Sequence, residues 1–200
     1  ARELHQNLII GDWHADSFLW SRDLTTDNDH GHVDIPKLQQ GNVALQMFTT
    51  VTKSPSGQNY EKNETDARDN ITALAIAQGW PIKTWRSLAE RAIFQAKKIK
   101  KLSQENPNDL MIIKSQNDVK NFLEQRKSNK DLIGGLIGTE GSHALDGDIK
   151  NVQRLHEEGF RMMSLHHFFD NKLGGSLHGT SGQGLSEFGY EVVNLIEDLE

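Results

Sequence analysis

Short apolar runs alternate with amphipathic stretches along most of the chain. The apolar run 8–10 predicts a short buried strand, and the β-branched and aromatic run 43–51 predicts a second strand. Run 132–139 holds almost only apolar and glycine residues, which is typical of a strand covered on both faces, and 161–165 predicts the next strand. Residues 110–113 form a further apolar run whose type the pattern leaves open.

Apolar residues at helical spacing fill most of the intervals between these runs. Asp34 is expected to cap a short helix that has Pro36 in its first turn and stops at Gly41, and Ser186 to cap the last helix. The other predicted helices are two segments within 67–105 that break at Trp80-Pro81, one at 116–127, and one at 148–158 that ends at Gly159, with loops at 52–65 and 174–184.

This order of elements predicts an α/β protein of the (β/α)8 TIM-barrel type. Strands that alternate with helices form parallel sheets, and a barrel gathers its active site where the strands end. About the first four βα units are present, because the sequence stops after a helix, where a fifth strand should begin. We therefore expect residues 1–200 to be the N-terminal half of a single barrel domain.

Composition narrows the classes of function. Hydrophobic residues make up 36% and charged residues 25% of the chain, so we expect a folded core. A net charge of −6 argues against a general nucleic-acid-binding surface. No run approaches the roughly 18 apolar residues of a transmembrane segment, so we expect a soluble chain. The absence of cysteine excludes thiolate metal sites and leaves the compartment, exported or cytoplasmic, open.

His14 and Asp16 form the first candidate site. They follow the first apolar run at alternate positions, so the imidazole and the carboxylate could bind one metal ion. The alternative is that Asp16 holds the histidine in a turn without any metal. His32 and Asp34 repeat the spacing, but the place after a buried strand favours the first pair.

Glu140 follows the glycine-rich strand and is flanked by Gly138 and Gly141. A carboxylate there could offer its two oxygens to two cations about 3.5–4 Å apart, or it could cap a helix or lie in a loop. His143 in the same turn is either a support for this site or a loop residue.

His166 and His167 end the next strand, and strand parity admits at most one of them to the barrel mouth. His30, His32 and His178 are expected in solvated loops.

Five ordered segments together resemble the membrane (renal) dipeptidases, which are zinc metallopeptidases with an amidohydrolase-like barrel. The segments are 12–16 (DWHAD), 34–43 (DIPKL followed by GNV), 138–146 (GTEGSHALD), 159–167 (GFRMMSLHH) and 184–193 (GLSEFGYEVV). The resemblance implies that His14 and Asp16 bind a first zinc ion and that Glu140 bridges two. It implies that His167 contacts the substrate and stabilises the tetrahedral oxyanion. The activity implied is hydrolysis of the peptide bond of dipeptides by a metal-bridging hydroxide.

The sequence departs from the family pattern at several positions. His166 stands where threonine is more common, Ala15 where asparagine is usual, and Phe168 where asparagine or serine is usual. The family's later ligands, two histidines for the second zinc, an aspartate and a substrate-binding arginine, lie in strands beyond these 200 residues. The isolated chain is therefore expected to be inactive.

Two alternatives remain open. The chain could be a half-barrel scaffold that pairs with the missing C-terminal half or with a second copy as a homodimer, or the site could serve another metal-dependent amidohydrolase or lactonase.

Overall fold

The computed structural model describes residues 1–199 and groups the chain into two compact units. Ala1–Thr49 and Lys97–Ile137 form the first unit, and Thr50–Ala96 and Gly138–Glu200 form the second. β2, α4 and β4 each run from one set of residues into the other.

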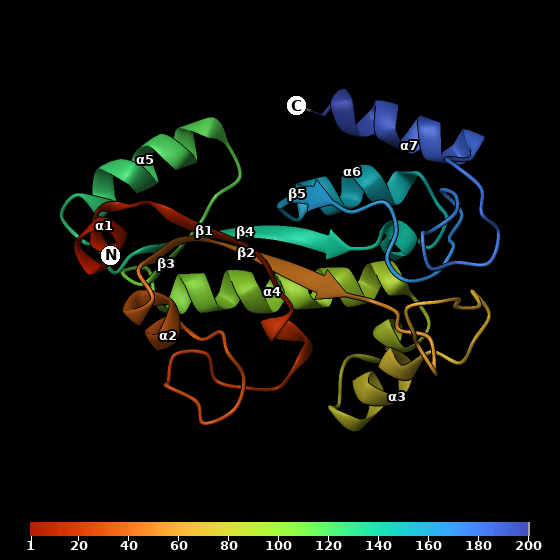
Figure 1. The fold of residues 1–200 in the computed structure, drawn as a ribbon, viewed down its shortest axis with the longest axis horizontal. Helices are drawn as coiled ribbons and strands as arrows, with labels where there is room; N and C mark the ends of the chain where they lie inside the picture. Colours follow the sequence, from red (N-terminus) through yellow and green to blue (C-terminus); the bar gives the residue numbers. More distant parts are fainter. Residues whose placement is uncertain (200) are drawn as a thin grey trace. The chain divides into compact units, whose positions relative to one another are not determined.

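Five strands form one sheet in the order β1-β2-β4-β3, and β5 also pairs with β4 (Figure 1). The β1–β2 and β3–β4 pairs are parallel. The strands are β1 Ile10–Ala15, β2 Val43–Val51, β3 Leu110–Ile112, β4 Ile133–Glu140 and β5 Phe160–Met163. The helices are α1 Arg2–Asn7, α2 Ile35–Gln40, α3 Asn70–Ala77, α4 Leu88–Glu105, α5 Gln116–Arg126, α6 Lys150–Glu157 and α7 Glu187–Glu197, with short 3-10 helices η1 Ser17–Leu19, η2 Ile82–Trp85 and η3 Ser142–Leu145. The predicted α/β class with a parallel sheet is confirmed.

The first strand differs from its prediction. It begins only at Ile10 and continues to Ala15, and Leu8 and Ile9 before it are 50% and 62% exposed. The prediction of a buried strand at 8–10 was therefore wrong. Among the described strands, β1 lies at the end of the order and pairs with β2 alone, so apolar residues at its start gain no cover from a second neighbouring strand. His14 consequently lies within the strand itself, one residue before its end.

Capping residues in the sequence correctly predicted the ends of other helices. Asp34 accepts a hydrogen bond of 3.0 Å from the Lys37 backbone N–H at the start of α2, and Gly41 ends this helix. The side chain of Ser186 caps α7 through the Gly189 N–H. Helix α5 buries Phe122, whereas the neighbouring Leu123 is 37% exposed.

Strand β4 is covered on both faces, as its composition predicts. A Cβ atom on Gly134 would lie 2.6 Å from Cδ1 of Ile113, and one on Gly135 would lie 2.9 Å from Cδ1 of Leu110. Since neighbouring residues of a strand face opposite sides, both faces of β4 are closely packed at this level. In the first unit this packing belongs to a core that includes Ala44, Ile113, Phe122 and Leu132.

In the second unit the start of α4 is capped from a distant segment. The Asp146 carboxylate accepts hydrogen bonds from the Ser87 hydroxyl at 2.6 Å and from the backbone N–H groups of Leu88 and Ala89 at 2.8 and 3.1 Å. These N–H groups have no partner within the helix itself. Asp146 therefore joins the η3 segment to α4.

Buried Arg91 joins α4 to α3. Its Nη1 lies 2.6 Å from Oδ2 of Asp69, the residue that caps α3. Burial raises the pKa of Asp69, but hydrogen bonds from Thr72 and Arg91 outweigh this and hold it below the usual value. The guanidinium also donates to Oγ1 of Thr72 and to the carbonyl oxygens of Thr52, Thr84 and Trp85.

Among residues 1–199, no helix is both long and apolar enough to cross a membrane.

Candidate metal centre

The end of β1 carries the first pair of candidate ligands. Nε2 of His14 lies 3.3 Å from Oδ2 of Asp16. The other oxygen of this carboxylate, Oδ1, accepts a hydrogen bond from the hydroxyl of Thr49 on β2. Thr49 is buried and both candidate ligands are partly exposed, so the threonine can fix the carboxylate while its second oxygen stays beside the imidazole. The sequence offered no signal for this role of Thr49 except its place in the β2 run.

The segment that follows Asp16 is held by a lysine of α4. Nζ of Lys98 donates to the carbonyl oxygens of Phe18 and Trp20 at 2.7 and 2.9 Å. Burial of this ammonium group lowers its pKa to about 8. Lys98 therefore anchors the turn in which the Asp16 backbone lies, a contact that the sequence did not suggest.

Glu140 ends β4, and its Oε1 lies 2.9 Å from Nε2 of His167. The next residue, Gly141, has φ +88°, and a Cβ atom there would lie 2.4 Å from the His143 ring. Its N–H donates to Oγ of Ser164 at 2.6 Å, and this hydroxyl donates to the Thr139 carbonyl at 3.0 Å. Only glycine suits this turn, so the glycine that the sequence singled out beside Glu140 has a steric reason.

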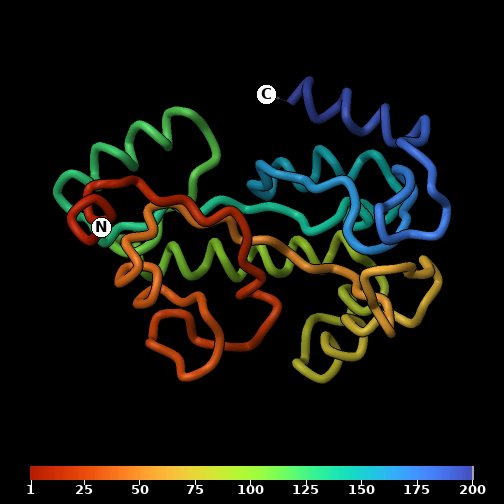
Figure 2. Tube along the Cα trace, viewed as in Figure 1, coloured from red at the N-terminus to blue at the C-terminus, as the bar shows by residue number. Residues whose placement is uncertain are grey.

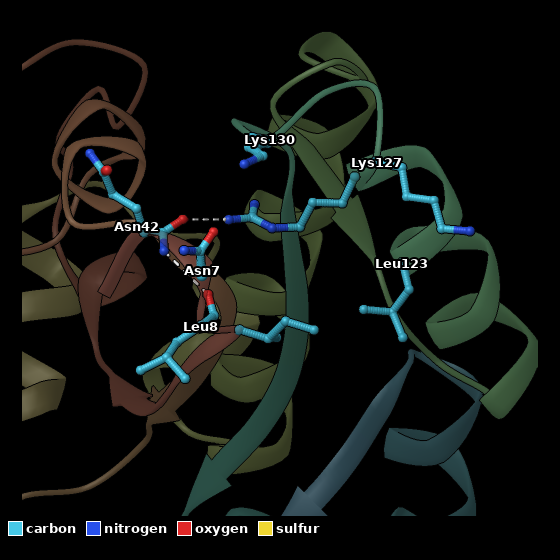
Figure 3. Close-up of a pocket in the computed structure, with 9 residues that line it drawn as sticks. Asn7, Leu8, Asn42, Leu123, Lys127 and Lys130 are labelled. Atoms are coloured by element: carbon cyan, nitrogen blue, oxygen red, sulfur yellow. Dashed lines mark hydrogen bonds between the residues drawn. The ribbon is translucent and has the colours of Figure 1, made fainter. Parts of the chain in front are cut away.

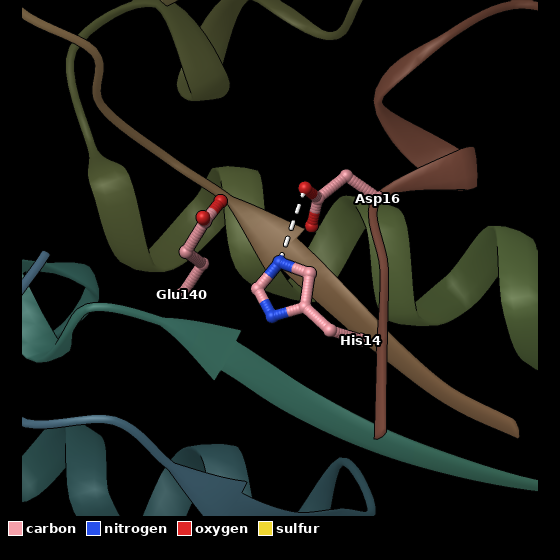
Figure 4. A group of neighbouring side chains, drawn as sticks. All are labelled: His14, Asp16 and Glu140. Carbon is pink, nitrogen blue, oxygen red and sulfur yellow. Dashed lines mark hydrogen bonds and ion pairs between the residues drawn. The ribbon is translucent and has the colours of Figure 1, made fainter. Parts of the chain in front are cut away.

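His14, Asp16 and Glu140 can each offer one ligand atom such that all three atoms lie within 4.8 Å of one another (Figure 4). Imidazole nitrogen and carboxylate oxygen are common zinc ligands, bound at about 2.0–2.2 Å. Tetrahedral geometry then separates neighbouring ligand atoms by about 3.4 Å. The 3.3 Å between Nε2 of His14 and Oδ2 of Asp16 fits this spacing.

The second His-x-Asp spacing has a different structural role. Asp34 is the buried N-cap of α2, and its Oδ2 lies 2.6 Å from Nζ of Lys37. His30 and His32 are exposed in the loop before it. Asp34 is therefore used by local structure, and His30 and His32 lie in an exposed loop, as expected from the sequence.

The other candidate histidines lie in three different environments. His167 is the one beside Glu140, which strand parity alone could not decide. His143 is buried in η3, its ring centroid lies 4.7 Å from that of Phe169, and burial lowers its pKa to about 3. His178, expected to be a plain surface residue, is instead half-buried and stacks on the Phe168 ring at 4.9 Å.

A pocket of about 200 Å³ lies near the N-terminus and is lined by residues that include Leu8, Asn42, Leu123 and Lys127 (Figure 3). Leu8 precedes β1, so this pocket lies at the opposite end of β1 from His14 and Asp16. None of the predicted site residues is among those that line it.

Solved structures share this architecture. The chain is similar to a probable dipeptidase, PvdM, from Pseudomonas aeruginosa, with a TM-score of 0.69 and 17% identity over 99% of this chain and 46% of that one. It is also similar to an amidohydrolase from Pseudomonas aeruginosa, with a TM-score of 0.60 and 18% identity over the same shares of the two chains. The fold is that of a TIM-barrel type protein, and the chain spans about half the length of these structures.

The family follows from the sequence match. The model of the membrane dipeptidases, peptidase family M19, matches residues 1–200. The chain belongs to this family, and the resemblance drawn from its five segments is confirmed.

Proposed function

We propose that this chain supplies about half of the active site of a zinc-dependent dipeptidase, as the N-terminal half of a single barrel domain. The observation that carries the proposal is the grouping of His14, Asp16 and Glu140, in which the His14–Asp16 spacing suits zinc, in a chain of the membrane dipeptidase family. Zinc ligands of the second ion beyond Glu140 would come from sequence outside these 200 residues.

The roles of the three ligands follow from their chemistry. His14 and Asp16 would hold the first zinc ion, and Glu140 would bind both ions through its two oxygens. Thr49 would keep Oδ1 of Asp16 occupied and so direct Oδ2 to the metal. When bound, zinc supplies a Lewis acid and lowers the pKa of a coordinated water toward neutrality.

His167 would act on the substrate. Its Nε2 lies 2.9 Å from Glu140, so an N–H at this atom points into the ligand group. A donor held at this position can stabilise the negative charge that develops on the carbonyl oxygen during attack on the peptide bond. Ser176 fixes the backbone of His167 by donating its hydroxyl hydrogen bond to the His167 carbonyl.

Zinc affinity of the intact protein tests the ligand assignment. Asp16→Asn should lower zinc affinity by at least about 10-fold, because a neutral amide replaces a charged ligand. His32→Ala removes a histidine of the same His-x-Asp spacing from an exposed loop and should leave zinc affinity unchanged. Equal zinc affinity in Asp16→Asn and the parent protein would refute the assignment.

A second pair of variants tests the support that Thr49 gives. Thr49→Val keeps the shape of the side chain but removes the hydrogen bond to Asp16, and should weaken zinc binding by roughly 10- to 100-fold. Thr50→Val is the matched control, because the neighbouring buried hydroxyl donates to the Gly138 carbonyl at 3.1 Å instead. Equal zinc affinities in the two variants would contradict the role of Thr49.

One similar structure is described as an amidohydrolase, so the same ligand group could act on another amide. A substrate panel separates this second candidate from a dipeptidase: hydrolysis of cyclic amides or lactones without hydrolysis of dipeptides would favour it.

A further inference from the structure

Three ring side chains, Tyr60, Phe168 and His178, form a cluster next to His167, and we refer to them as the aromatic cluster. The Phe168 ring stacks on the His178 ring at 4.9 Å and an interplanar angle of 20°. Tyr60 contacts both of these rings edge-on, at 5.4 Å and 5.9 Å. The Phe168 centroid lies 4.8 Å from that of His167, so the cluster is continuous with the His167–Glu140 pair.

The two loops that carry the cluster are tied to each other. The backbone N–H and the side-chain amide of buried Asn63 donate to the His178 carbonyl at 2.8 and 3.1 Å. Oγ1 of Thr65 donates to the Asp170 carbonyl at 2.8 Å. The loop before α3 and the glycine-rich loop before α7 therefore lie side by side (Figure 2). These bonds tie together the two loops that carry Tyr60 and His178.

The glycine-rich loop has its own internal support in Asp170. Its carboxylate accepts hydrogen bonds from the backbone N–H groups of Ser176, Thr180 and Ser181 at 2.7 to 2.9 Å. A Cβ atom on Gly179 would lie 1.8 Å from this carboxylate, so the loop closes tightly around it. The position of His178 within this loop is thus set by a charged side chain from the Phe168 segment.

One edge of the aromatic cluster is exposed, whereas Phe168 and His178 are partly buried. Tyr60 is 81% exposed, and Leu177, next to His178, is 91% exposed. Exposed apolar side chains beside a polar site are typical of ligand-binding surfaces. Asparagine or serine, which is usual in the family where this chain has Phe168, would provide no ring for Tyr60 and His178 to pack against.

We propose that the aromatic cluster is the subsite for an aromatic or large aliphatic side chain of the dipeptide. This inference rests on the proposed dipeptidase function and adds its substrate class. A ring or branched chain placed against Tyr60 and Phe168 would remove apolar surface from water and gain ring–ring contact, and each such contact changes affinity roughly 2- to 13-fold. A dipeptide with only small side chains would gain neither.

The test compares kcat/KM of the zinc-loaded intact protein on Ala-Phe and Phe-Ala with that on Ala-Ala. Phe168→Ser should lower the preference for the better phenylalanine dipeptide over Ala-Ala by about 10-fold, since apolar contacts to one side chain discriminate in this range. Tyr60→Ala should lower the preference by about 3-fold, and its exposed position keeps the fold intact. Tyr190→Ala, an exposed aromatic residue of α7, is the matched control and should leave the preference unchanged.

The outcomes distinguish a failure of the proposed subsite from a failure of the proposed dipeptidase function. An unchanged preference in both Phe168→Ser and Tyr60→Ala, with Ala-Ala still hydrolysed, overturns the subsite and leaves the dipeptidase function standing. An equal loss on all three dipeptides also overturns the subsite, because it would mean that Phe168 acts only through the fold or through His167. Failure of the parent protein to hydrolyse any of them overturns both proposals.

Discussion

His143 shows how one side chain can combine close packing with an electrostatic cost. Its ring packs against Phe169 and lies so close to Gly141 that a Cβ atom added there would come within 2.4 Å of it. Neither ring nitrogen has a hydrogen-bond partner among the described residues. Its pKa is lowered to about 3, chiefly by burial, with smaller contributions from the nearby His167, Lys53 and Arg91 that outweigh the opposing effect of Asp69. The imidazole is therefore neutral in the folded protein across the physiological range.

This burial predicts a loss of stability in acid. An unfolded histidine has a pKa of about 6.5, so below that pH the unfolded chain binds a proton that folded His143 does not bind until about pH 3. The free energy of unfolding should therefore fall as pH falls from 6.5 towards 3, by up to about 1.4 kcal/mol per pH unit from this group. Urea unfolding at several pH values, with chelator present, measures the effect.

His143→Phe should remove this part of the pH dependence, because phenylalanine keeps a ring in the site without a titrating nitrogen. His30→Gln changes an exposed loop histidine and should leave the pH dependence as it is. A His143→Phe profile parallel to that of the parent protein between pH 6.5 and 4 would contradict the account.

Helices α3 and α4 depend on the buried Arg91–Asp69 pair. Each guanidinium nitrogen of Arg91 has a partner, and Asp69 also caps α3 through the N–H groups of Ile71 and Thr72. Removal of one member leaves a buried charge and several carbonyl oxygens without donors. Arg91→Met should therefore lower the free energy of unfolding by about 3–5 kcal/mol, measured by urea denaturation.

The exposed pair Lys101–Glu105 of the same helix provides the comparison. Its atoms lie 3.6 Å apart, and both side chains are largely exposed. Lys101→Ala should change the free energy of unfolding by less than about 0.5 kcal/mol. Similar effects of Arg91→Met and Lys101→Ala would show that the buried network does not stabilise the two helices.

Elements with local start and stop signals were predictable from the sequence. Asp34, Pro36 and Gly41 mark α2, Ser186 marks α7, and the run 43–51 coincides with β2. β1 was misplaced because exposed Leu8 and Ile9 look like a strand core in the sequence, whereas burial depends on which strands are neighbours. Capping of α4 by Asp146 was missed for the same reason, since the two partners lie 57 to 59 positions apart.

Some residues of the candidate site could be predicted from the sequence and others could not. His14, Asp16 and Glu140 could be selected because metal-ligand residues occur near strand ends, and the structure brings these three together. The sequence could not single out Thr49, Lys98 or Tyr60, because threonine in a strand, lysine in a basic helix and tyrosine in a loop are common in proteins of every kind. Their roles depend on contacts between segments distant in the sequence.

At the scale of the whole molecule, fold and family agree. The chain has the TIM-barrel type fold of solved structures that share only 17% and 18% identity with it, and the membrane dipeptidase model matches residues 1–200. The chain spans 46% of each of those structures, so the activity of a whole enzyme stays a proposal for it.

The most direct test of the proposed function is hydrolysis of simple dipeptides such as Ala-Ala by the intact protein, with and without a chelator. We predict that the chelator reduces hydrolysis to background and that added zinc restores it, because the proposed role of His14, Asp16 and Glu140 is to hold metal. Hydrolysis that persists in the presence of the chelator, or none after zinc is restored, would contradict it.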